Sequence, residues 1–96
     1  MTFDKKVKIL QTWLDIMSVN GYEVISVAST RTDNEIDHTF QIMEGKTEDF
    51  YLITVRNDGR LINQNGEDLL IVARDSFSND DAMLEAIDAL EKEIKE

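Results

Sequence analysis

The chain has 96 residues, of which 20 are acidic and 10 are basic, so its formal net charge at neutral pH is −10. This length suits one domain with a single core, and a hydrophobic fraction of 42% argues against a disordered chain. The lack of cysteine excludes disulfides, thiolate metal sites and a cysteine nucleophile, and the single histidine excludes any site that needs two imidazoles.

Membrane and secretory classes are disfavoured as well. No apolar run approaches the roughly 20 residues that a membrane-spanning helix needs, and the first residues lack the continuous apolar segment of a signal peptide. We therefore expect a cytoplasmic protein.

Residues 1–20 are predicted to form an amphipathic helix. Five apolar side chains recur at alternating spacings of four and three and so share one face; they are Phe3, Val7, Leu10, Leu14 and Met17. A second stripe beside them consists of Ile9, Trp13 and Ile16. Together the stripes are wider than the ~100° of an ordinary surface helix. The helix should therefore be covered on more than one side, by a sheet and a second helix or by a partner.

The middle of the chain reads as extended structure. Residues 22–30, 38–44 and 50–56 are rich in β-branched and aromatic side chains, and the polar stretches between them are short enough for an antiparallel meander. Asn57-Asp58-Gly59 and Asn65-Gly66 are turn signals that bracket a short strand at 60–63. Ile71 and Val72 favour a further strand at 69–73, with a helix as the alternative because the run is too short for its period to decide.

A closing helix is expected from about Ser78. Ser78 and Asp81 have the spacing of a capping box, and Asp80 adds favourable negative charge to the helix N-terminus. The inner stripe is Met83, Ile87, Leu90 and Ile94, with Asp88/Lys92 and Glu91/Lys95 as flanking ion pairs at i,i+4.

The predicted fold class is therefore α+β in one domain. It has an N-terminal helix, a four- to five-stranded antiparallel meander and a C-terminal helix, with both helices on one face of the sheet so that both apolar stripes are buried. A parallel dinucleotide-binding sheet is disfavoured because the chain shows no βαβ pattern.

Nothing in the chain supports an enzyme. Every histidine-based mechanism would need His38, which is predicted to lie at the start of a strand next to Asp37, where an exposed or hydrogen-bonded structural histidine is the simpler interpretation. The four glycines are scattered singly at turns, so no phosphate-binding loop exists.

One spacing is reminiscent of a metal site. Asp33, Glu35 and Asp37 alternate, and Glu44 falls at the twelfth position of a calcium loop, but His38 stands where that loop requires glycine, and strands rather than helices flank the segment. A solvated acidic loop is the better interpretation, and we expect neither a metal nor a cofactor.

The charge is graded along the chain. The net charge is +1 over residues 1–20, −4 over residues 21–60 and −7 over residues 61–96. Such a field repels nucleic acid and anionic membrane surfaces and attracts basic proteins. The expected partner is a basic protein, such as a nuclease or another nucleic-acid-binding enzyme.

The acidic residues near the C-terminal helix are the candidate contact surface. They are Asp58, Glu67, Asp68, Asp75, Asp80, Asp81, Glu85 and Asp88. In size, charge and mix of elements the chain resembles small acidic inhibitor proteins of phages and mobile elements, of the nucleic-acid-mimic or anti-CRISPR type. The resemblance rests on no sequence motif, so it transfers no functional residue. It implies a non-enzymatic inhibitor that occupies the basic nucleic-acid groove of its target.

Two other functions stay open at this point. The chain could be a structural or oligomerisation module that dimerises through Ile9, Trp13 and Ile16, unless the closing helix covers them. It could also bind a small molecule between sheet and helices, although no distinctive polar cluster supports this.

Overall fold

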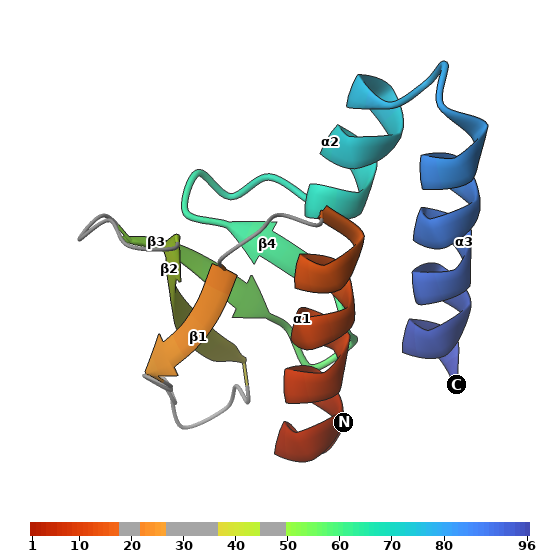
Figure 1. The fold of residues 1–96 in the computed structure, drawn as a ribbon. Coiled ribbons are helices and arrows are strands. Elements are labelled where there is room, and N and C mark those ends of the chain that lie inside the picture. The colour runs from red at the N-terminus through yellow and green to blue at the C-terminus, as the bar shows by residue number, and fades with distance from the viewer. Residues whose placement is uncertain (18–21, 27–36, 45–49) are drawn as a thin grey trace.

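The computed structural model describes residues 1–17, 22–26, 37–44 and 50–96 of the chain. The described residues form an α+β fold, which confirms the predicted class. The elements in chain order are α1 (Phe3–Met17), β1 (Tyr22–Ser26), β2 (His38–Glu44), β3 (Phe50–Val55), β4 (Leu61–Asn63), α2 (Leu69–Ser76) and α3 (Asp81–Lys95). Figure 1 shows the sheet on one side of the molecule and the helices on the other.

The strands form one antiparallel sheet in the order β1-β2-β3-β4. In the central pair, Phe40 lies opposite Ile53 and His38 opposite Val55. Val55 also faces Leu61 of the short strand β4. This register places alternate side chains of each strand on the same face of the sheet.

One face of the sheet is buried under the helices. Phe40, Ile42, Val55 and Leu61 are fully buried there. On the opposite face Thr39 and Thr54 are half-buried, and their hydroxyls form a cross-strand hydrogen bond of 2.9 Å. The alternation of buried and half-buried positions is the pattern of a sheet with one covered face.

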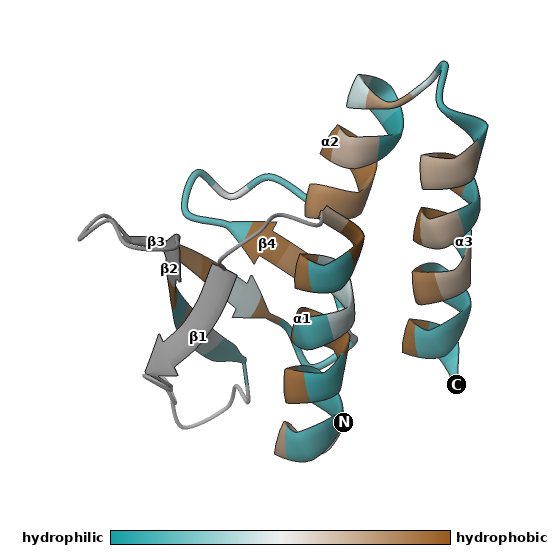
Figure 2. Cartoon of the chain, in the orientation of Figure 1, coloured by the Kyte–Doolittle hydropathy of each residue, from teal (hydrophilic) through white to brown (hydrophobic). Residues whose placement is uncertain are grey.

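Helix α1 lies between the sheet and α3 (Figure 1). Its buried residues Ile9, Leu10, Trp13 and Leu14 belong to the same core cluster as the sheet residues and as Ile87 and Leu90 of α3. The apolar residues of α3 face α1, and its polar residues face outward (Figure 2). The wide apolar arc of α1 is thus covered by the sheet and by a second helix.

Residues 69–73, for which a strand was favoured, form part of α2. The carboxylate of Asp68 caps this helix by accepting hydrogen bonds from the backbone N–H groups of Leu70 (3.0 Å) and Ile71 (3.3 Å). Leu70 and Ala73, three residues apart, are the buried side chains. The cap and this helical spacing of buried positions outweigh the strand preference of Ile71 and Val72.

The start of α3 also differs from the prediction. Asp80, not Ser78, is the N-cap, and its carboxylate accepts a hydrogen bond of 3.1 Å from the backbone N–H of Met83. Residues 77–80 connect α2 to α3, and Ser78 lies exposed within that connection.

None of the helices in the described ranges combines the length and apolar character that a bilayer crossing would require.

Candidate functional site

Four exposed acidic residues gather where α2 passes into α3. Asp75 lies near the end of α2, Asp80 caps α3, Asp81 lies in its first turn and Glu85 lies one turn later. We call these four residues the acidic tip. It lies at the end of the molecule away from both termini (Figure 1). From residue 75 to residue 91 the chain contains six acidic residues and no basic one, and the nearest base in sequence is Arg74, which directly precedes Asp75.

Arg74 joins α2 to α3 beside the acidic tip. Its guanidinium donates to Asp88 at 2.6 Å and to Glu91 at 2.5 Å. The hydrogen bond to Asp88 raises the pKa of Arg74, with the negative charges of Asp88 and Glu91 adding to the effect and partial burial opposing it. Arg74 therefore stays a cation that is neutralised by two carboxylates of α3.

This pairing corrects the ion pairs predicted from sequence spacing. Asp88 and Glu91 bind Arg74 of the neighbouring helix rather than Lys92 and Lys95 of their own. A planar guanidinium presents a fork of donors that can serve two carboxylates at once, which a lysine four residues away cannot match. As a result Asp88, a predicted partner-binding residue, is engaged within the chain.

The remaining predicted partner-binding acids lie at the start of α2 and in the turn between β3 and β4. Asp68 is the half-buried N-cap. Glu67 is exposed and accepts a weak hydrogen bond from the Asn63 side chain at 3.3 Å. Asp58, in the turn between β3 and β4, lies 3.6 Å from the guanidinium of Arg60. Of these three, Asp58 and Glu67 are exposed and Asp68 is half-buried.

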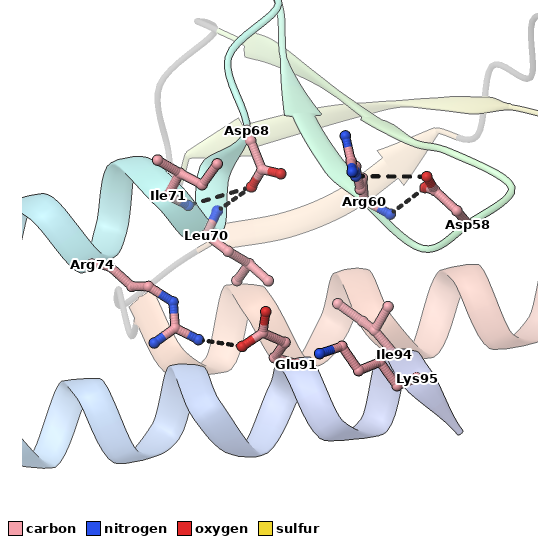
Figure 3. Close-up of a pocket in the computed structure, with 9 residues that line it drawn as sticks. All are labelled: Asp58, Arg60, Asp68, Leu70, Ile71, Arg74, Glu91, Ile94 and Lys95. Carbon is pink, nitrogen blue, oxygen red and sulfur yellow. Dashed lines mark hydrogen bonds and ion pairs between the residues drawn. The ribbon is translucent and has the colours of Figure 1, made fainter.

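A pocket of about 450 Å³ lies between the β3–β4 turn, α2 and α3 (Figure 3). Its polar lining combines three acids with three bases, and its apolar lining consists of three aliphatic side chains. The lining residues are Asp58, Arg60, Asp68, Leu70, Ile71, Arg74, Glu91, Ile94 and Lys95. The formal charges cancel, and the lining contains no cysteine, serine or histidine that could act as a nucleophile or base.

A shallower hollow lies on the outward side of α2. It is lined by Glu67, Ile71, Val72, Arg74, Asp75 and Ser76. Ile71 is 67% exposed and Val72 is 37% exposed, so two adjacent aliphatic side chains face solvent. Sequence reasoning missed this surface because it favoured a strand for residues 69–73 and so gave no outward helix face.

The residues of the dimer patch predicted on α1 are not exposed. Ile9 and Trp13 are buried in the core of the single chain, and Ile16 packs against that core as a half-buried side chain. These side chains need no second copy to cover them.

His38 is buried at the start of β2, where its Nδ1 lies 2.9 Å from the Nζ of Lys6. The ring of Phe3 stands edge-on to it with a centroid distance of 5.0 Å. The surroundings are those of a structural histidine in the core.

Two of the four acidic residues in the calcium-like spacing, Asp33 and Glu35, lie outside the described residues. Asp37 accepts a hydrogen bond of 2.9 Å from the backbone N–H of Asn57, and Glu44 is part of β2. Within the described ranges, no three acidic or histidine side chains are close enough together to hold a metal ion.

Comparison with protein-family models, with curated proteins and with solved structures finds no match to this chain.

Proposed function

We propose that this protein is a non-enzymatic, protein-binding inhibitor whose acidic surface occupies a basic, nucleic-acid-binding groove of a target protein. The observation that carries the proposal is the acidic tip, formed by Asp75, Asp80, Asp81 and Glu85. All four are exposed, and they follow one another along a short helical hairpin without an intervening base.

The position of the acidic tip supports this role. Like charges held close together on a folded scaffold produce a field that attracts an oppositely charged surface and raises its association rate. Lys92 and Lys95 occupy the last turn of α3, at the other end of that helix from the acidic tip. Arg74, the nearest base in sequence, is neutralised by Asp88 and Glu91. The charge of the acidic tip is thus left to act on a partner.

A groove that binds nucleic acid is a suitable target because it presents clustered lysine and arginine side chains at phosphate spacing. A rigid row of carboxylates can replace the phosphates there without being a substrate. The proposed class is that of the small acidic inhibitors of phages and mobile elements, with the cytoplasm as the site of action.

The test is competition with nucleic acid. The immobilised protein is incubated with cell lysate at low ionic strength, and the captured proteins are eluted with duplex DNA or with salt. We expect basic nucleic-acid-binding proteins to be released by both treatments, because salt screens the contacts and DNA competes for the groove. Capture that neither salt nor DNA reverses would contradict the proposal.

The matched variants change charge at opposite ends of the molecule. Asp81→Lys/Glu85→Lys inverts two charges of the acidic tip, whereas Asp4→Lys/Glu96→Lys makes the same change in net charge near the termini, where both residues are exposed. The first variant should weaken binding at least about tenfold at low salt and the second much less. Asp88 is left unchanged because reversing it would break its bond to Arg74. Equal loss in both variants would mean that net charge alone drives binding, which contradicts a defined contact site.

A further inference from the structure

The outward side of α2 combines exposed apolar and acidic side chains. Among the described residues, the large hydrophobic side chains that are exposed are Phe3, Ile71 and Val72. Single exposed hydrophobic residues are ordinary in soluble proteins, but Ile71 and Val72 are adjacent and line the same hollow as Glu67 and Asp75. We call Glu67, Ile71, Val72 and Asp75 the α2 outer face.

We propose that the α2 outer face is the anchoring surface for the partner, and that it binds a basic segment carrying a large aliphatic or aromatic side chain. This inference rests on the proposed function and specifies which chemical features of the partner are recognised. The acidic tip attracts the basic surface, and the apolar side chain of the partner packs against Ile71 and Val72.

The spacing of the acids on this face matches such a segment. Asp75 follows Ile71 by four residues within α2, which places the two on the same side of that helix. Glu67 precedes the Asp68 cap and lines the same hollow, so two carboxylates accompany the apolar contact. A helical partner with lysines or arginines one turn before and after its apolar side chain would pair with both. Arg74 also lines the hollow, but its charge is held by Asp88 and Glu91 and so does not oppose a basic partner.

Charge also argues against a second copy of the chain as the occupant. In a two-fold symmetric contact the same patch meets itself, so Glu67 and Asp75 of each copy would approach the acids of the other. The acidic tip next to this face would add to the repulsion at a net charge of −10 per chain.

The experiment uses two synthetic helical peptides of about 18 residues, a length that forms several helical turns. Both are lysine-rich with the same net charge; one has leucine at helical spacing on one side, and the other has alanine at those positions. Each is titrated into the isotopically labelled full-length protein, and the backbone amide shifts and the dissociation constant are measured.

We expect the leucine peptide to bind at least about tenfold more tightly than the alanine peptide, because only leucine buries substantial apolar surface against Ile71. The largest amide shifts should fall within residues 67–76. Ile71→Ser should remove the preference for leucine, whereas Ile71→Leu should retain it as the matched control. Ile71 is exposed, so both variants should keep the melting temperature of the unmodified protein.

The outcomes separate this inference from the proposed function. Salt-sensitive binding of both peptides, with a leucine preference that survives Ile71→Ser, would overturn the anchoring role of the α2 outer face and leave the proposed function standing. Absence of salt-sensitive binding by either peptide would overturn both. A dimer in light scattering that Ile71→Ser converts to a monomer would replace the basic partner with a second copy of the chain.

Discussion

Lys6 and His38 lie against each other in the interior, 2.9 Å apart between Nζ and Nδ1, although they are 32 residues apart in sequence. Lys6 has no exposed surface and His38 only 9%. The contact ties α1 to the first residue of β2, next to Phe3 and Phe40, whose rings stack with a centroid distance of 5.9 Å. A lysine is seldom fully buried without a partner, so this side chain contributes to the core both through its aliphatic stem and through the polar contact of Nζ.

The buried lysine should be important for stability. Lys6→Met keeps most of the volume but removes the polar contact with His38, and we expect it to cost about 1–3 kcal/mol. Lys6→Ala also leaves a cavity and should cost about 2–5 kcal/mol. Urea denaturation measures both values. Equal losses in the two variants would show that the stem of Lys6 contributes no packing.

Gly59 should tolerate no side chain. Its φ of +91° is unfavourable for other residues, and a Cβ there would overlap with Cγ2 of Ile94 and approach Cε of Met1 to 3.0 Å. We expect Gly59→Ala to cost about 2–4 kcal/mol, from strain of about 1–2 kcal/mol and displacement of α3.

Gly66 provides the matched control for that substitution. It has a similar φ of +81°, but nothing lies near the position of a Cβ. Gly66→Ala should therefore show only the backbone strain of about 1–2 kcal/mol. Thermal unfolding of the two variants separates backbone strain from the clash with Ile94. An equal loss of stability in both variants would mean that the contact between the β3–β4 turn and α3 is loose.

The helix caps can be tested directly. Asp68→Ala and Asp80→Ala should each cost about 0.5–2 kcal/mol, since each removes acceptors for backbone N–H groups at a helix start. Ser78→Ala should change the free energy of unfolding by less than about 0.5 kcal/mol. A larger loss of stability for Ser78→Ala than for Asp80→Ala would indicate that Ser78 is the N-cap, as the sequence spacing predicted.

Arg74 should affect stability and binding in opposite directions. Arg74→Gln should cost about 0.5–1.5 kcal/mol, a modest value because all three side chains are at least 35% exposed and their charges are screened by solvent. The same change frees the carboxylates of Asp88 and Glu91, so a basic peptide should bind about two- to fivefold more tightly at low salt. Weaker binding by a folded Arg74→Gln protein would contradict the conclusion that Arg74 occupies two carboxylates that would otherwise attract a basic partner.

The contribution of Arg74 to the pH dependence of stability follows from the direction of its pKa shift. The folded state raises the pKa of Arg74, so its stabilising contribution is fully present below the ordinary pKa of arginine and is lost only as the pH rises through the raised value. Arg74 does not titrate in the neutral range. The difference in free energy of unfolding between the wild-type protein and Arg74→Lys should therefore stay constant there. Urea denaturation at several neutral pH values tests this.

Local pattern was sufficient for part of the fold. The helical spacing of apolar residues predicted α1, and dense β-branched and aromatic residues predicted β2 and β3, because helical and extended periods differ over a long enough run. The same reasoning failed at residues 69–73. A five-residue apolar run has no distinguishable period, and the cap from Asp68 and the burial of Leu70 and Ala73 made it helical.

By itself, the sequence determined the α+β class and the concentration of negative charge toward the C-terminus, since both depend on residue type and order alone. The tertiary structure decided which charges and apolar groups are available. It buried Ile9 and Trp13, paired Asp88 and Glu91 with Arg74 of another helix, and left Ile71 and the acidic tip exposed. These outcomes depend on which elements pack together, and spacing along one helix cannot reveal a counter-charge supplied by its neighbour.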